Sequence, residues 1–382
     1  MVDAYLHATQ VIPERLGHAA PGDVSIYEGA DAVEQASPAW RLLEGAGTTS
    51  FQSLAIARAV ARAHVARGER PRVVVVRDNG RPVVVFPTVI CRFAGLMTAR
   101  FLGDPFIQYG DALVAPDATP AHLAAAWSAA ADPQVVRLGL FRRVRADSRL
   151  ASLLTHRATT IGSDEAPFVD VGGGETSNGR HARERRRLRR RLAEQGPLGF
   201  EVQQGPAAIG ILQETLALKR AWLVERGLPS TVLGNTHWEE VLFAAAAGGS
   251  GVLTAARLTV GGATAATEIG LADDKTWYAY VAALVPAFAK FGPGHVLMDD
   301  ILMWCAETKR TIYDLLPPSQ PYKHALATGR VAVNDYAIAF GPLGHAAALA
   351  VRGLPAAKRL AAALPLGLRQ KMVGAYLRIA AK

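Results

Sequence analysis

The feature that most constrains this chain is a glycine-rich turn followed by an amphipathic helix and a short strand, between Lys290 and Lys323. Gly292 and Gly294 let the backbone approach an anion closely, and the free N–H groups of the next helical turn point at such a ligand. Apolar residues after the turn recur with helical spacing, which predicts one packed face and one solvated face. We therefore expect the turn to bind phosphate through Lys290, Gly292, Gly294 and His295. The alternative is a tight turn that enters an ordinary core helix, with His295 as its cap.

Composition indicates a folded protein with anionic partners. Half of the 382 residues are hydrophobic, which is enough to build two domains of ordinary size. The net charge of +9 favours nucleotide phosphates, lipid headgroups or nucleic acid as partners. Cys91 and Cys305 lie far apart in apolar stretches, so we expect neither a disulfide framework nor a metal site. With no apolar core of a secretory signal and no run of membrane-spanning length, the expected location is the cytoplasm.

The order of predicted elements indicates a mixed α/β fold with largely antiparallel sheets. Strands 72–76 and 82–90 flank turn residues 78–80 and predict a hairpin. The other predicted elements are helices 51–66, 120–131, 207–226 and 236–247, strands 135–141, 199–204, 277–284, 311–315 and 331–340, and a hairpin of strands 251–260 and 263–271.

A loose, glycine-rich stretch from Asp164 to Gly179 predicts a domain boundary near residue 175. The expected units are an N-terminal domain, 1–175, a C-terminal domain, 176–340, and a basic tail, 341–382. After Asp335 the chain has no acidic residue, whereas basic residues recur through an Ala/Leu-rich tail. The tail therefore predicts amphipathic helices, broken at Pro355 and Pro365, that lie on the anionic inner face of the cytoplasmic membrane. A helical cap docked on the protein is the alternative.

Most of the chain resembles the GNAT acyltransferase superfamily, in particular the FemAB-like branch that includes the CelD-type proteins of bacterial exopolysaccharide synthesis. In the second half the resemblance rests on Pro293-Gly294, Tyr313-Asp314 and Tyr322-Lys323, and in the first half on PVVVFPTVI, RFLGD and FQS. The resemblance implies tandem GNAT-like domains. It also implies an acyl-CoA donor, with acetyl-CoA first, and an amine or hydroxyl acceptor on a sugar or lipid-linked saccharide of the cell envelope.

One position departs from the family pattern. The GNAT phosphate loop has the pattern Gln/Arg-x-x-Gly-x-Gly/Ala. When its glycines are aligned with Gly292 and Gly294, the first position is Ala289 instead of a basic or amide residue, and Lys290 follows one residue later.

Some FemAB relatives use aminoacyl-tRNA, so an aminoacyl-tRNA-dependent transferase is one alternative, although the chain lacks the long coiled-coil arm of that subgroup. A non-catalytic, membrane-associated and nucleotide-responsive effector of the same pathway is the second.

Attack on a thioester needs a positioned acceptor, a base and donors for the oxyanion. Glu268 and Asp314 lie in apolar strands, where burial would raise a carboxyl pKa toward neutrality. Each is a candidate base, and a structural hydrogen-bonding role is the alternative. Tyr322 is the candidate acid for the departing thiolate, and Lys323 the candidate contact for a phosphate or carboxylate. The alternative for this pair is packing and a surface charge.

An aromatic side chain between cations marks the candidate acceptor site. Lys219, Trp222 and Arg226 fall on neighbouring turns of the helix 207–226. Such a platform suits a sugar, and the alternative is a packed Trp with a solvated basic flank.

The segment Arg180–Arg191 contains eight arginines and one glutamate. Charge on every helical face predicts a solvated basic helix or an anion site, for which Arg183, Arg187 and Arg190 are the candidates. The expected ligands are a lipid-pyrophosphate sugar carrier, a cyclic dinucleotide regulator or anionic lipid. Nucleic acid is disfavoured, because aromatic residues that would stack on bases are absent from the segment.

Overall fold

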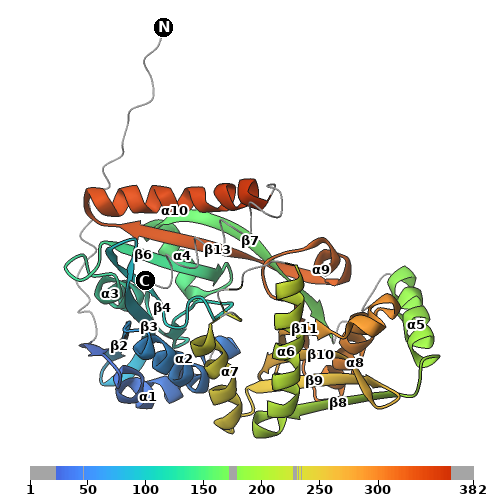
Figure 1. Cartoon of the computed structure of the whole chain (residues 1–382). Coiled ribbons are helices and arrows are strands. Elements are labelled where there is room, and N and C mark those ends of the chain that lie inside the picture. The colour runs from blue at the N-terminus through green and yellow to red at the C-terminus, as the bar shows by residue number, and fades with distance from the viewer. Residues whose placement is uncertain are drawn as a thin grey trace.

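The computed structural model describes residues 23–45, 47–171, 179–226, 230, 232–233 and 235–362. One mixed sheet runs through both halves in the order β1-β2-β3-β4-β6-β13-β7-β12-β11-β10-β9-β8, and β5 pairs with β3 (Figure 1). The predicted mixed α/β class is confirmed.

The first half contains β1 (Asp23–Glu28), α1 (Ala32–Leu43), α2 (Leu54–Ala66), β2 (Arg70–Asp78), β3 (Arg81–Phe93), β4 (Leu96–Phe101), β5 (Leu113–Val114), α3 (Pro120–Ala130), β6 (Leu138–Arg145), α4 (Arg149–Arg157) and β7 (Thr159–Asp170). The second contains α5 (Gly179–Ala193), β8 (Leu198–Gln204), α6 (Ile209–Glu225), α7 (Thr236–Ala247), β9 (Leu253–Val260), β10 (Ala263–Ala272), β11 (Thr276–Leu284), α8 (Pro293–Glu307), β12 (Ile312–Asp314), α9 (Pro321–Leu326), β13 (Gly329–Ala339) and α10 (Gly341–Ala362).

The two halves repeat one topology, which confirms the expected tandem arrangement. In each, an antiparallel meander is followed by a helix and then by a strand parallel to the last strand of the meander. In the first half α3 connects β4 to the parallel β6, and in the second α8 connects β11 to the parallel β12. The apolar runs of β2 and β3 are buried because α1 and α3 pack on these strands.

The halves exchange strands at their junction. β13 comes from the second half but pairs antiparallel with β6 and β7 of the first, and β7 in turn pairs with β12. Part of the stretch predicted to be loose is therefore a strand, β7, near the middle of the sheet. The sequence TTIGSDEAPFVD does not indicate a strand, because polar side chains on both faces obscure the two-residue alternation of apolar and polar positions. The boundary proposed near residue 175 lies outside the described residues.

The tail begins with α10, which lies lengthwise against β13 and β7 (Figure 1). Val351 is buried there. The helix continues through Pro355, so the predicted break at that residue is wrong: a proline removes its own N–H bond but the helix on either side can persist. Pro365 and the rest of 363–382 lie outside the described residues. No helix in the part that the structure describes has both the length and the apolarity to cross a bilayer.

Candidate donor and catalytic site

The centre of the candidate site is the point where two parallel strands separate. β11 and β12 pair through Thr276–Ile312, Trp277–Tyr313 and Tyr278–Asp314, whereas β11 continues beside β10 to Leu284. Between the pairs Ile269–Val281 and Gly270–Ala279 the register shifts, which leaves Tyr280 as a bulge. Among the described strands none pairs with this edge of β11 beyond Tyr278, so its backbone N–H and C=O groups can bind an extended ligand.

The predicted phosphate turn lies at the end of this edge. Gly292 has φ 65° and ψ 45°, a left-handed conformation that favours glycine, and it precedes Pro293, the first residue of α8. The first turn of α8 contains no acidic residue, so its N–H groups and the helix dipole favour an anion. The ammonium of Lys290 lies 5.0 Å from the Phe291 ring, and His295 N–H donates to the Gly292 carbonyl at 3.1 Å.

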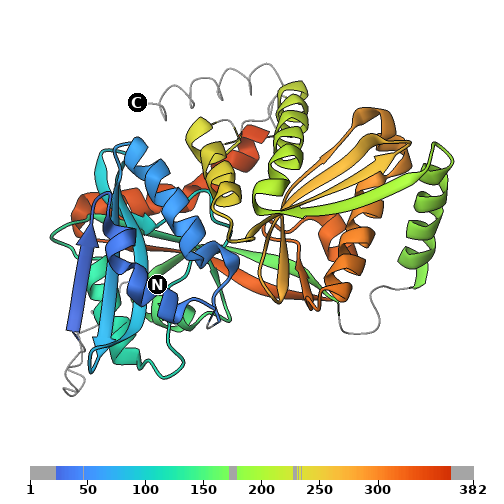
Figure 2. The ribbon, with the colours of Figure 1, turned by 90° about the horizontal axis from the view of Figure 1, so that it is seen from below.

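The arginine-rich helix α5 docks beside this turn (Figure 2). Arg185 pairs with Asp299 at 2.7 Å, and Arg189 pairs with Asp300 at 2.5 Å. Leu188 lies 3.1 Å from where a Cβ on Gly292 would be. One face of α5 is therefore packed against α8, which the charge pattern did not indicate.

The three candidate anion-binding arginines have different surroundings. Arg187 is exposed and pairs with Glu184 at 2.6 Å. Arg183 and Arg190 are exposed on α5, in the helix that covers the turn. The structure thus places a basic surface next to the predicted phosphate turn.

Glu268 of β10 is buried on the α8 side of the sheet. It accepts hydrogen bonds from Trp277 Nε1 at 2.8 Å and from Tyr313 OH at 2.9 and 3.0 Å. Burial raises the pKa of its carboxyl to about 7, although both hydrogen bonds oppose this shift. Glu268 is therefore suited to exchange a proton near neutral pH.

The Tyr-Lys pair lies on α9, with its two side chains in different environments. Tyr322 is half-exposed, and burial together with the charge of Glu268 raises the pKa of its hydroxyl. Lys323 is buried and donates from Nζ to the carbonyls of Leu316 at 2.7 Å and Pro318 at 3.0 Å. Burial lowers the pKa of Lys323 to about 8. The charge of Glu268 thus acts on the Tyr322 hydroxyl, whereas Lys323 fastens the loop after β12.

Asp314 lies on the opposite face of the sheet from Glu268. Adjacent strand residues point to opposite faces, so Tyr313 meets Glu268 whereas Asp314 faces the first half. Its carboxylate accepts from Tyr109 OH at 2.9 Å and from Arg145 Nη1 at 3.3 Å. Burial raises the pKa of Asp314, and the charge of Arg145 opposes the shift. The structure separates the two carboxylates that the sequence suggested as candidate bases.

The three candidate acceptor residues come together at the C-terminal end of α6, where Lys219 and Trp222 lie on the helix and Arg226 is its C-cap. The helix packs against β10 and β11. Lys219 Nζ lies 4.4 Å and the Arg226 guanidinium 4.9 Å from the partly exposed Trp222 ring. Burial lowers the pKa of Lys219. The aromatic–cation platform is present as a geometric feature.

Sequence reasoning missed Tyr109 and Arg145. Tyr109 contacts a residue 205 positions away, so no local pattern could reveal the pair. Trp277 and Tyr313 were recognised as strand residues, but their shared bond to Glu268 depends on the alignment of β10, β11 and β12.

Comparison with known proteins gives a domain match in the second half and a shared fold over most of the chain. Residues 179–324, which include the turn, Glu268 and Tyr322, match the sequence model of the acetyltransferase (GNAT) domain. The fold is GNAT-like. No curated protein sequence matches the chain.

Three solved structures share the fold across most of the chain. The C-terminal domain of a putative lysylphosphatidylglycerol synthetase from Agrobacterium fabrum has a TM-score of 0.54 and 14% identity, covering 84% of this chain and 95% of that chain. L-PGS from Bacillus licheniformis has a TM-score of 0.54 and 14% identity, covering 83% and 96%. FemX has a TM-score of 0.50 and 12% identity, covering 74% and 91%. At these identities the likeness concerns the fold alone.

Proposed function

We propose that the protein is an acyl-CoA-dependent acyltransferase, with acetyl-CoA as the first donor to test. The proposal rests on the separation of β11 from β12 at Tyr278, which leaves one edge of β11 unpaired. The turn at Gly292, which begins α8, lies at the far end of this edge. A pyrophosphate would bind the N–H groups that begin at Gly294, with Lys290 nearby. The extended arm of the donor would bind the free edge of β11.

The reacting groups would be Glu268 and Tyr322. An acceptor nitrogen or oxygen attacks the thioester carbonyl carbon, and Glu268 takes its proton. The C–S bond then breaks, and the Tyr322 hydroxyl protonates the departing thiolate. Free N–H groups of β11 would stabilise the oxyanion. Asp314 and Lys323 would position the strand and loop without touching substrate.

We further propose a sugar or lipid-linked saccharide of the cell envelope as acceptor. The aromatic face and flanking cations of the Lys219–Trp222–Arg226 platform support this class, because sugars pack on aromatic rings and their anionic groups pair with cations.

A second candidate is aminoacyl transfer from charged tRNA. The exposed arginines of α5 beside the donor turn favour a polyanionic donor. The chain shares its fold with FemX and with a domain of a putative lysylphosphatidylglycerol synthetase. The name of the second protein refers to a lipid that carries a lysyl group. Transfer from charged tRNA, with no acetyl-CoA binding, would favour this candidate. A complete lack of turnover with either donor would favour a non-catalytic effector.

Replacing Gly294 by Phe tests the donor site. A Cβ at Gly294 would lie 3.0 Å from a Leu284 methyl, so a large side chain must occupy the space above the turn. Acetyl-CoA affinity measured by calorimetry is expected to fall at least about tenfold. Gly210→Phe is the matched control: it changes the second residue of α6, where no heavy atom lies within 4 Å of the added Cβ. Wild-type protein that does not bind acetyl-CoA would contradict the proposal.

We also propose that α10 and the basic tail hold the enzyme on anionic membrane lipid. Leu343 and Leu349 of α10 are 71% and 69% exposed, and Arg352 is exposed beside them. Apolar side chains next to cations suit an interface of anionic lipid.

Replacing both leucines by serine tests this membrane contact. Partitioning of the Leu343→Ser/Leu349→Ser variant onto phosphatidylglycerol vesicles is expected to fall at least about tenfold, because two apolar side chains are lost. Leu42→Ser is the control, since Leu42 is 70% exposed on α1, away from α10. Equal partitioning of wild type and double variant in a flotation assay would rule out this role for α10.

A further inference from the structure

A groove of about 510 Å³ lies beside α10, which packs lengthwise on β13 and β7 (Figure 1). This volume is within the range of small-molecule sites. The walls come from the last turn of α4, the first residues of β7, the last residues of β13 and the first part of α10. None of the described lining residues belongs to the candidate donor and catalytic site, so a ligand in this groove would be neither the donor nor the acceptor.

All titratable side chains that line this groove are basic. They are the exposed residues His156, Arg157, His345 and Arg352. No acidic residue is among the described lining residues. Asp335, the nearest acidic residue along β13, is outside the lining, and its carboxylate accepts a backbone N–H at 2.8 Å. The groove therefore favours an anionic ligand.

The two arginines of the groove are available to such a ligand. None of the ion pairs among the described residues includes Arg157 or Arg352. His345 is different, because its Nδ1 donates to the Gly341 carbonyl at 2.8 Å, one turn earlier in α10. Residues 363–382, which follow α10 in the sequence, include basic residues but no acidic side chain, so they do not supply the missing negative charge.

The rest of the lining is mostly apolar. Ile161, Ala337, Ala339 and Ala348 pack in one small cluster under α10. Leu349 also lines the groove and is 69% exposed. An apolar surface next to cations suits an amphiphile, because its alkyl chain leaves water while its charged headgroup pairs with the cations.

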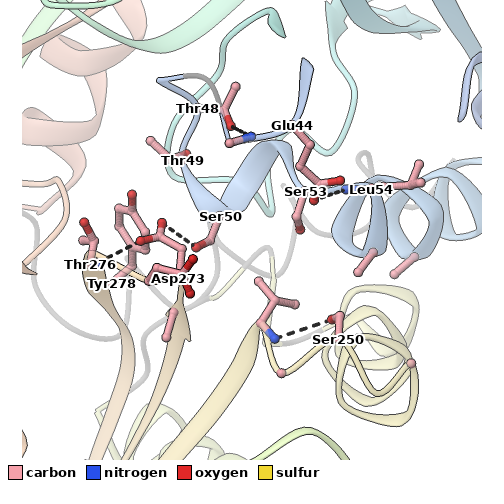
Figure 3. Close-up of a pocket in the computed structure, with 18 of the residues that line it drawn as sticks. Glu44, Thr48, Thr49, Ser50, Ser53, Leu54, Ser250, Asp273, Thr276 and Tyr278 are labelled. Atoms are coloured by element: carbon pink, nitrogen blue, oxygen red, sulfur yellow. Dashed lines mark hydrogen bonds between the residues drawn. The ribbon is translucent and has the colours of Figure 1, made fainter. Parts of the chain in front are cut away.

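A larger cavity, of about 910 Å³, lies between the two halves and lacks this excess of one charge (Figure 3). Its described lining contains four carboxylates and four cations, which are Glu34, Glu44, Asp273 and Asp274, and Arg58, Arg62, Lys275 and Arg310. Several of its hydroxyl groups already form local hydrogen bonds: Ser50 donates to Asp273, and Thr48 accepts from Gly45 N–H, both at 3.1 Å. Charge therefore selects a ligand class in the groove beside α10 and not in the larger cavity.

We infer that the groove binds a single anionic phospholipid, through its phosphate and part of one acyl chain. The phosphate would pair with Arg157 and Arg352, because guanidinium groups form strong, charge-assisted hydrogen bonds with phosphate oxygens. The chain would lie on the apolar surface formed by β7, β13 and α10. This inference rests on the proposed membrane contact of α10 and deepens it, from a surface that touches anionic lipid to a site for one lipid molecule.

Calorimetry with short-chain lipids tests the ligand class without a membrane. Dihexanoylphosphatidic acid, dispersed as single molecules, is expected to bind wild-type protein at least about tenfold more tightly than dihexanoylphosphatidylcholine, because only the first has a net negative headgroup. Glycerol 3-phosphate carries the same phosphate without acyl chains and is expected to bind at least about tenfold more weakly than the anionic lipid. Equal affinity of the anionic lipid and either of the other two probes, or no binding of the anionic lipid at all, would overturn the inference.

The vesicle assay of the membrane contact is a separate measurement. Binding of the dispersed lipid without partitioning onto vesicles would support the groove and contradict the membrane contact. Partitioning onto vesicles without binding of the dispersed lipid would support the membrane contact and contradict the groove.

Charge reversal locates the headgroup. Arg157→Glu/Arg352→Glu changes two exposed residues, so it is expected to fold and to bind dihexanoylphosphatidic acid at least about tenfold more weakly than wild type. Arg41→Glu/Arg62→Glu is the matched control, because it makes the same change in net charge at exposed positions of α1 and α2, outside the groove. Wild-type affinity in the first variant would place the phosphate elsewhere and refute the assignment.

Filling the groove locates the chain while every charge is kept. Ala348→Phe adds a large side chain to the lining and is expected to lower the affinity for dihexanoylphosphatidic acid at least about tenfold. Ala346→Phe is its control, since Ala346 is exposed on α10 and is not part of the lining. Equal affinity of Ala348→Phe and wild type would show that the chain lies outside the groove.

Discussion

The Glu268→Gln variant is expected to lose at least about 100-fold in acyl-transfer rate, because general acid–base catalysis commonly contributes that much. Glutamine has nearly the same shape and can still accept the hydrogen bonds of Trp277 and Tyr313, but it cannot take a proton. The change therefore removes the proposed base with little change in packing. Release of CoA thiol from acetyl-CoA in the presence of an amino sugar such as glucosamine provides the assay.

The pH dependence gives an independent check on this role. Because the pKa of Glu268 is about 7, the wild-type rate should rise with pH and level off above neutrality. Glu307→Gln, a change of an exposed carboxylate on α8, should keep the wild-type rate and profile. A fully active Glu268→Gln variant would show that the proton goes elsewhere.

The Glu268→Gln variant should be more stable than wild type at neutral pH, although its transfer rate is lower. Folding raises the pKa of Glu268 from 4.5 to about 7, so the folded state favours the neutral carboxyl. Below pH 4.5 the group is neutral in both states, and as pH rises to 7 the folded state loses stability relative to the unfolded state. Between pH 5 and 8 this loss is about 2.5 kcal/mol. Urea unfolding of Glu268→Gln should lack that loss.

Local patterns predicted the parts of the site that depend on adjacent residues. The helix after Gly292 and the hairpin of β2 and β3 follow from periodicity and turn residues, which act over a few positions. The candidate base Glu268 was recognisable as an acid in an apolar strand, and the structure places it fully within the core.

Long-range pairing could not be predicted in the same way. The sequence predicts β13 as a strand but does not indicate which strands it pairs with. Its partners are β6 and β7 of the first half, and this pairing depends on how the two halves pack together. The arginines of α5 indicated a solvated helix, because the acids that bind them, Asp299 and Asp300, lie on α8 more than a hundred residues later. The two candidate carboxylates looked alike in sequence, and only the sheet shows that they face opposite sides.

Replacing Asp314 by Ala is expected to destabilise the protein by about 3–5 kcal/mol, because it removes one member of a buried charged network. The loss leaves Tyr109 OH without its acceptor and Arg145 without one of its carboxylates, at the junction of the two halves. It also removes the acceptor for the Leu316 N–H, at 2.8 Å, which helps to shape the loop after β12. Equilibrium urea unfolding measures the change. Asp117→Ala, which breaks an exposed pair with Arg81, should change stability by less than about 1 kcal/mol.

The Asp314→Asn variant separates a structural from a catalytic role. Asparagine keeps an oxygen that can accept from Leu316 N–H and Tyr109 OH, but it removes the charge that faces Arg145. If Asp314 only positions β12 and its loop, the variant should be less stable than wild type yet keep most of its transfer rate and the same pH profile. If Asp314 takes the acceptor proton, the rate should fall about as far as in Glu268→Gln, whatever the stability. Because Asp314 and Glu268 face opposite sides of one sheet, these two outcomes also decide from which side the acceptor approaches the donor.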